Sequence, residues 1–134
     1  MTFDSADALI ARVNAQVVEA QERADRARQL RIGVDEVRGK ASSPRNEVEV
    51  AVDSSGRLTN LQLTDSALEY RASDLAALIV KTAQAAHRKA GEQVIGLAAD
   101  AFGEDSDVVT RVRGELAERV PEEESSIGYD RDKA

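Results

Sequence analysis

The stretch from residue 47 to residue 63, EVEVAVDSSGRLTNLQL, decides the fold. Valines alternate with polar or small residues in its first part, which predicts a half-buried strand at 48–52. The sequence DSSG at 53–56 is typical of a tight turn, in which Gly56 supplies a positive φ. Alternation then resumes over about 57–64, so the stretch predicts an antiparallel β-hairpin.

A long helix is predicted before the hairpin. Apolar residues recur at alternating spacings of three and four from Ile10 to Ala27, and neither Pro nor Gly interrupts residues 5–32. Ser5 is a candidate N-cap and Gly33 a natural C-terminal stop. This heptad-like seam has two interpretations: it covers the protein's own sheet, or it packs against another helix, from this chain or from a second copy.

Further elements complete the predicted order. Residues 35–42 predict another strand, joined to the hairpin by a turn at 43–46, which makes a three-stranded antiparallel meander. A second long helix follows, capped by Ser73 and ending near Gly103. A short amphipathic helix is predicted over 106–120. The fold class is therefore α+β, with a protomer of order α-β-β-β-α.

The formal net charge of −7 is unevenly distributed along the 134 residues. Residues 1–103 carry fifteen acidic and thirteen basic side chains, whereas residues 104–134 carry ten acidic and five basic ones. We therefore take 1–103 as one domain and 104–134 as an acidic extension, which we expect to be disordered over 121–134. Because the domain itself is nearly neutral, the overall charge does not exclude binding to DNA.

The composition excludes several kinds of chemistry. The absence of Cys removes disulfides and thiolate metal sites. His87 is the only His, and no phosphate loop, zinc motif or calcium loop is present. We therefore expect no enzymatic activity, no cofactor, no metal and no small-molecule substrate. Without a signal-peptide pattern or an apolar run of ~18 residues, we expect a cytoplasmic protein with no membrane partner.

Basic residues gather in the second half of the first predicted helix and just beyond it. Such a patch can contact DNA phosphates. It can also be a solvated helix face, in which Glu19 and Glu22 pair with the arginines four positions later. A weaker candidate patch consists of Lys81, Arg88 and Lys89 on the second helix. The candidate DNA-binding residues are Arg23, Arg26, Arg28, Arg31, Arg38, Lys40 and Arg45.

A symmetric homodimer is predicted because two helices longer than the sheet leave apolar stripes uncovered. Aromatic residues are only 3% of the chain, so the core is built from small aliphatic side chains and gains from a second subunit. The candidate interface residues come from the helix seam and from the hairpin: Ile10, Val13, Val17, Val48, Val50, Leu61 and Leu63.

The segment 42–63, followed by Ser73-Asp74-Leu75, Ile79, Ala83 and Ala86, resembles the YbaB/EbfC family of nucleoid-associated proteins in its actinobacterial form. The resemblance covers roughly residues 5–100. It implies a tight homodimer whose helices project like the arms of tweezers, which binds double-stranded DNA at the nucleoid with little sequence preference. The basic residues on and beyond the first helix are the matching candidates by location.

Two alternatives remain open from the sequence. The first is a dimeric interaction or adaptor protein without a nucleic-acid role, such as an accessory of type VII secretion, because a fold alone does not decide function. In the second, the acidic extension acts as a DNA mimic that folds over the basic patch and competes with phosphate.

Overall fold

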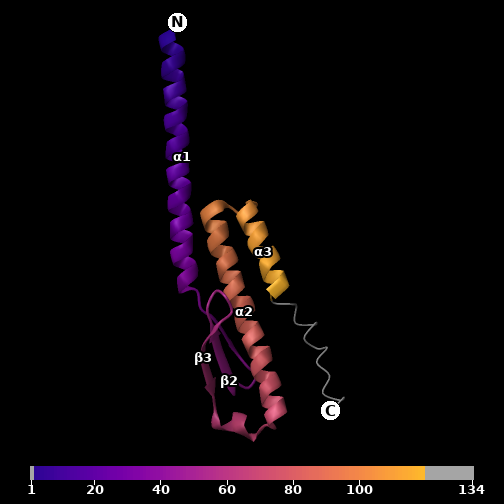
Figure 1. Ribbon diagram of the computed structural model, residues 1–134. Helices are drawn as coiled ribbons and strands as arrows, with labels where there is room; N and C mark the ends of the chain where they lie inside the picture. Colours follow the sequence, from indigo (N-terminus) through magenta and orange to yellow (C-terminus); the bar gives the residue numbers. More distant parts are fainter. Residues whose placement is uncertain (1, 120–134) are drawn as a thin grey trace.

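The structure is a computed structural model, and it describes residues 2–119 (Figure 1). It confirms the α+β class and the three-stranded meander. The expectation of disorder over 121–134 lies outside the described residues. The elements are helix α1 (Thr2–Glu36), strands β1 (Gly39–Ser42), β2 (Val48–Val52) and β3 (Leu58–Leu63), the 3-10 helix η1 (Asp65–Glu69), and helices α2 (Ala72–Phe102) and α3 (Asp107–Arg119).

The predicted hairpin is confirmed as β2 and β3, and β1 joins β2 on its other side. Gly56 has φ 85° in the connecting turn. There Asp53 Oδ1 accepts the backbone N–H of Arg57 and that of Ser55, each at 2.9 Å. These hydrogen bonds, that from Arg57 first, lower the pKa of the Asp53 carboxyl. A bulge in the β2–β3 pairing places Leu58 opposite Val52.

Helix α2 covers one face of β1 and β2. Val48, Val50 and Val52 are at most 1% exposed and belong to the same core cluster as Ala86 of α2. Gly39 allows β1 to approach closely, since a Cβ there would lie 2.1 Å from the carbonyl oxygen of Ala86. By contrast, all six residues of β3 are exposed. The core therefore lies between α2 and the first two strands.

Helix α1 differs from the prediction at both ends. It continues through Gly33 to Glu36, because Gly33 packs against α2 instead of turning the chain: a Cβ there would lie 3.3 Å from Leu97 Cδ1. The strand predicted from residue 35 consequently begins only at Gly39. The N-terminal end lies at Thr2, so Ser5 is inside the helix and is not its cap.

Helix α2 begins at Ala72, which places Ser73 inside the helix and makes Arg71 the N-cap, without a side-chain hydrogen bond. The predicted end near Gly103 is confirmed. Gly103 has φ 93°, and its N–H donates to the Ala99 carbonyl at 2.7 Å. This conformation favours glycine and reverses the chain direction.

Helix α3 folds back along α2 and confirms the helix predicted at 106–120. Ser106 Oγ accepts the N–H of Val109 at 3.2 Å, which caps the N-terminal end of α3. Val109 is fully buried. Leu116 packs on Gly91 of α2, where a Cβ would lie 2.4 Å from Leu116 Cδ1. The beginning of the acidic extension is therefore part of the folded body.

Candidate nucleic-acid interface

Helix α1 forms an arm that extends beyond the ends of α2 and α3 (Figure 1). It has 35 residues and packs on α2 near its C-terminal end, around Gly33. Residues 5–29 are all exposed. The basic candidates on α1 are thus held on a single long helix, with solvent on most sides.

Four of the candidate arginines lie on the C-terminal half of this arm. Arg28 pairs with Asp25 at 3.2 Å, and both side chains are more than 60% exposed. Within the described part of the chain, the expected pairings of Glu19 and Glu22 with the arginines four positions later do not close to 4.0 Å. No carboxylate in residues 2–119 therefore holds Arg23, Arg26 or Arg31 in an ion pair.

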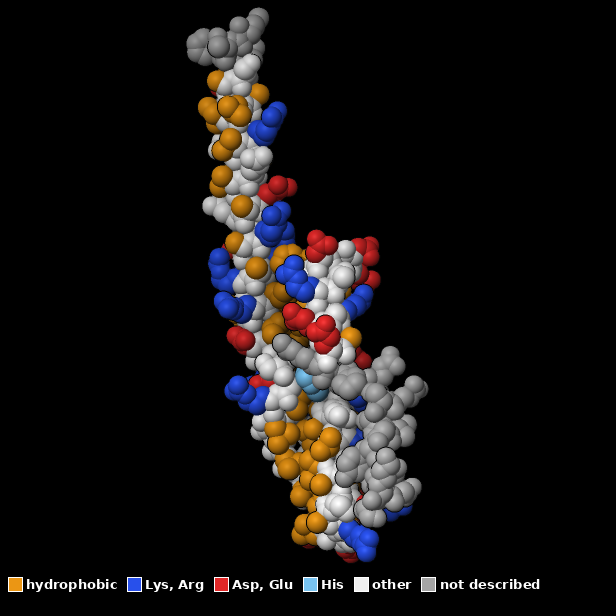
Figure 2. All heavy atoms as spheres, turned by 45° about the vertical axis from the view of Figure 1, so that its right-hand side comes forward, with side chains coloured by type: hydrophobic (Ala, Val, Ile, Leu, Met, Phe, Trp, Pro, Cys, Tyr) orange, Lys and Arg blue, Asp and Glu red, His pale blue; other side chains and the backbone are white. Residues whose placement is uncertain are grey.

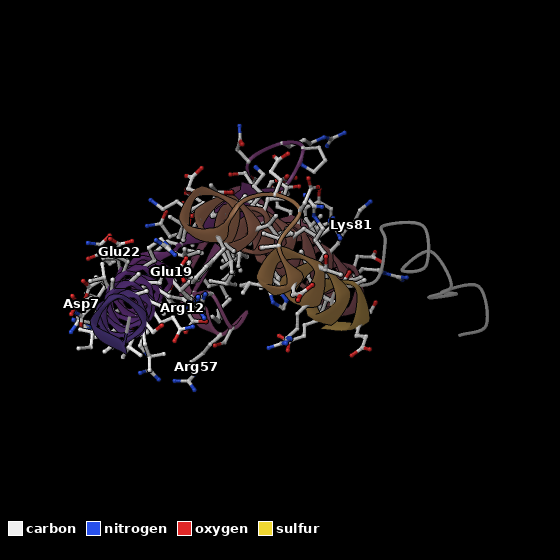
Figure 3. The ribbon with its side chains drawn as sticks, turned by 90° about the horizontal axis from the view of Figure 1, so that it is seen from above. Asp7, Arg12, Glu19, Glu22, Arg57 and Lys81 are labelled. Atoms are coloured by element: carbon white, nitrogen blue, oxygen red, sulfur yellow. The ribbon has the colours of Figure 1, made fainter. Side chains whose placement is uncertain are left out.

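The arm is of mixed charge. Figure 3, which looks along it, shows the side chains of Asp7, Arg12, Glu19 and Glu22 distributed around α1. Towards its C-terminal end the arginines become more frequent. Phosphate contact is therefore favoured near the body and disfavoured towards the tip.

Arg38 and Lys40 continue the basic surface past the end of α1. Arg38 Nη1 donates to the carbonyl oxygens of Val37 at 2.7 Å and Asp35 at 3.2 Å. Carbonyls at a helix C-terminal end lack partners within the helix, so this guanidinium is fixed at that point. Lys40 is exposed on β1, and the residues on either side of it, Gly39 and Ala41, are both buried.

Arg45 is separated from this group. It lies in the turn between β1 and β2, beyond the far end of β1, and that strand's four residues span about 13 Å. The hydroxyl of Tyr70 donates to Glu47 Oε2, and Ser43 Oγ donates to Oε1. The hydrogen bond from Tyr70 is the main cause that lowers the pKa of Glu47, and the charge of Arg45 acts in the same direction. Arg45 is thus next to a carboxylate that carries negative charge.

Arg57 is a basic residue that sequence reasoning missed. It is exposed at the end of the β2–β3 turn, and the charges of Arg57 and Arg38 both lower the pKa of Asp53, so both lie near that carboxyl. Figure 3 shows Arg57 on the α1 side of the body and Lys81 on the far side. The hairpin therefore adds Arg57 to the basic surface formed by α1, Arg38 and Lys40. The weaker candidate patch around Lys81 lies on the other side of the body and is separate from it.

The seven candidate interface residues fall into two environments. Val48 and Val50 are fully buried in the protomer's own core, so they have no surface left for a second copy. The other five are between 37% and 57% exposed: Ile10, Val13, Val17, Leu61 and Leu63. Among the candidate interface residues, the apolar surface that a second copy could contact therefore lies on α1 and β3.

Metal and membrane sites find no support in residues 2–119. No three His, Asp or Glu side chains gather there as metal ligands, and none of the helices in that range is both long and apolar enough to span a bilayer. His87 supports the hairpin turn, since a Cβ on Gly56 would lie 2.6 Å from its ring Cε1. The basic surface is thus the site with the best-defined chemistry.

Comparison with known proteins supports the interpretation of the basic surface as a nucleic-acid interface. The model of the YbaB/EbfC DNA-binding family matches residues 5–103, from α1 to the end of α2. Helix α3 lies outside the match. No curated protein matches the chain significantly.

Proposed function

The chain belongs to the YbaB/EbfC family of nucleoid-associated DNA-binding proteins, and on this premise we propose that it binds duplex DNA at the nucleoid as a homodimer. The observation that carries the proposal is a set of exposed guanidinium groups that reaches from α1 to the nearby end of the sheet. The proposed phosphate contacts are Arg23, Arg26, Arg28, Arg31, Arg38, Lys40 and Arg57.

The mechanism is electrostatic. Each phosphate neutralised by a basic side chain releases condensed counterions, so affinity falls as salt rises, with a slope of about 0.9 per neutralised phosphate on logarithmic axes. Contacts to phosphates fix position without reading sequence. No aromatic side chain interleaves with these arginines in the sequence, so stacking on bases contributes little. The expected binding has little sequence preference.

A salt titration of duplex binding by the full chain tests the proposal. Changing Arg26, Arg28 and Arg31 together to Ala should weaken binding and reduce the salt slope by about 0.9 for each phosphate that is no longer neutralised. Arg45→Ala is the control: it also removes an exposed arginine, but one that lies beyond the far end of β1. If the triple variant has the affinity and salt slope of the wild type, the proposed contacts are wrong.

A dimeric adaptor without a nucleic-acid role is the second candidate. It is favoured by the exposed apolar side chains of α1 and β3 and by the net charge of −7. An adaptor would show no duplex binding even at ~50 mM salt, where phosphate contacts are strongest.

A further inference from the structure

Three charged residues are neighbours at the end of the sheet where α1 joins β1. Gly39 of β1 pairs with Val52 of β2, so the next position outward brings Arg38 opposite Asp53. On the other side of Asp53, the backbone N–H of this residue donates to the carbonyl oxygen of Arg57 at 2.9 Å. Asp53 therefore lies between two arginines that come from different connections, α1–β1 and β2–β3.

The side chains of these residues lie on the face of the sheet that α2 leaves open. Gly39 faces α2, because a Cβ there would collide with the backbone of that helix. Side chains alternate along a strand and directly opposed residues share a face, so Arg38 and Asp53 are on the open face. Figure 3 shows that Arg57 also extends from the body on the side away from α2.

Asp53 fixes the backbone of Arg57. Its Oδ1 accepts the N–H of Arg57 and that of Ser55, each at 2.9 Å. The hydrogen bond from Arg57 is the main cause that lowers the pKa of the Asp53 carboxyl, so Asp53 is a carboxylate at neutral pH. This carboxylate therefore determines where the side chain of Arg57 leaves the turn.

Arg38 is also held in place, by contacts with two helices. Gln93 of α2 donates from Nε2 to the Arg38 carbonyl oxygen at 3.0 Å. Arg38 Nη1 donates to two carbonyl oxygens at the C-terminal end of α1. A guanidinium has five N–H donors, so those on Nε and Nη2 remain for a ligand.

The two arginines are close enough to contact one phosphate. They lie on either side of Asp53, so two strand spacings separate their Cα atoms by about 10 Å. Guanidinium groups that converge from this separation can donate to different oxygens of a single phosphate. Figure 2 shows Lys and Arg side chains at one edge of the molecule, from the lower half of α1 down to the level of His87, on which the hairpin turn packs.

We propose that Arg38 and Arg57 bind the same phosphate of the duplex and that Asp53 is the positioning residue of this two-arginine site. The inference rests on the proposed DNA binding and specifies one of its contacts. Because both arginines are held before binding, ordering them costs less than ordering two free arginine side chains. A phosphate bound from two sides also fixes the position of the DNA backbone at the end of the sheet.

The salt dependence of duplex binding by the full chain tests whether the phosphate is shared. Arg38→Ala and Arg57→Ala should each weaken binding a few-fold at ~50 mM salt but hardly change the salt slope, because the remaining guanidinium still neutralises the phosphate. The double variant should reduce the slope by about 0.9 for each bound copy of the site. Losses of about 0.9 in each single variant and about 1.8 in the double one would show two separate phosphates and overturn the inference.

Arg31→Ala combined with Arg57→Ala is the matched control. Arg31 is exposed on α1, seven residues and about 10 Å before Arg38, so it contacts a different phosphate. In this pair the loss of slope should equal the sum of the losses in the single variants. In the pair of Arg38 and Arg57 it should exceed that sum.

Two substitutions of Asp53 test its role in the Arg38→Ala background, where Arg57 alone holds the phosphate. Asp53→Ala removes the acceptor of the Arg57 N–H and should reduce the slope by about 0.9, as Arg57→Ala does in this background. Asp53→Asn keeps a side-chain oxygen and removes only the charge, so it should retain the slope and bind duplex at least as tightly as Arg38→Ala alone. An unchanged slope in Asp53→Ala, or an equal loss in Asp53→Asn, would refute the positioning role.

The outcomes keep this inference distinct from the proposed function. If the wild-type chain binds no duplex at ~50 mM salt, DNA binding fails and the two-arginine site falls with it. If the wild type binds and the double variant keeps the wild-type slope, the two-arginine site is wrong while DNA binding stands.

Discussion

At the scale of single residues, Gly39 is the position where the backbones of β1 and α2 approach each other closely. A Cβ on Gly39 would lie 2.1 Å from the Ala86 carbonyl oxygen and 2.6 Å from the Ala90 nitrogen, and neither backbone atom can move aside alone. Gly39→Ala should therefore force β1 away from α2 and reduce the free energy of unfolding by about 3 kcal/mol. Urea unfolding of the full chain measures this.

Gly96→Ala is the control for that prediction. Gly96 lies inside α2, and a Cβ there meets nothing within 4 Å. Removing backbone freedom from a helix interior should raise the free energy of unfolding by about 0.5–1 kcal/mol. Equal effects of the two substitutions would contradict the role given to Gly39.

The hydrogen bond from Tyr70 to Glu47 has a measurable pH signature. It raises the pKa of Tyr70 and lowers that of Glu47 from its ordinary 4.5. The lowered pKa stabilises the fold above the unfolded value, and this contribution is lost as pH falls through the folded one. The raised pKa of Tyr70 stabilises the fold below pH 10 and is lost at higher pH.

Tyr70→Phe should therefore raise the pKa of Glu47 towards 4.5 and make unfolding depend less on pH on the acid side. NMR titration of the Glu47 carboxyl carbon measures the change. Ser66→Ala is the control, because the Ser66 hydroxyl bonds to Thr64 and not to Glu47. An unchanged Glu47 pKa in Tyr70→Phe would show that this hydrogen bond is not the main cause of the shift.

At the scale of elements, local patterns predicted the hairpin and long-range contacts decided what the patterns missed. Valine alternation and the DSSG turn are local, so β2, β3 and their connection were predictable. The end of α1 was not, because Gly33 is kept helical beside Leu97, 64 residues away in sequence. The alternation of Val48 and Val50 predicts that one face of the strand is buried, but it does not show that α2 of the same protomer buries it.

The basic site was predictable only in part, for a similar reason. The cluster of arginines in α1 can be read from the sequence. That Arg57 belongs to the basic surface and Arg45 does not depends on how the strands pair. An antiparallel hairpin returns the chain to its starting end, so Arg57 comes near Arg38, while Arg45 is carried to the other end of β1.

Helix α3 is anchored along one flank of α2, and its stability should therefore be local. Val109→Ala removes about 1.5–2 kcal/mol of burial from a fully buried position. Amide hydrogen exchange in α3 should become about tenfold faster or more while β1 and β2 keep their protection. Arg113→Ala, an exposed position on the same helix, is the control. Equal loss of protection in the strands would make α3 part of the global unfolding unit.

At the scale of the whole molecule, the negative charge of the last fifteen residues should oppose DNA binding. Residues 120–134 carry five acidic and two basic side chains. Cutting after Arg119 preserves α3 and should strengthen duplex binding several-fold at ~50 mM salt, with a smaller gain at ~200 mM because screening is stronger. A full-length variant with Glu122, Glu123 and Glu124 changed to Gln separates charge from length. Unchanged affinity in both variants would refute the competition.

Helix α1 packs on α2 near its C-terminal end, around Gly33, while residues 5–29 are exposed, so the helix can act as a lever. A pivot of 10° about Gly33 would displace Thr2, about 46 Å away, by roughly 8 Å, but Arg31 by less than about 1 Å. The arginines nearest Gly33 would keep their positions, whereas the apolar seam residues from Ile10 to Val17 would move several times further. In the proposed function, the arginines near Gly33 would therefore keep their positions relative to the phosphates, while the N-terminal part of the same helix could adjust its position to contact a second copy.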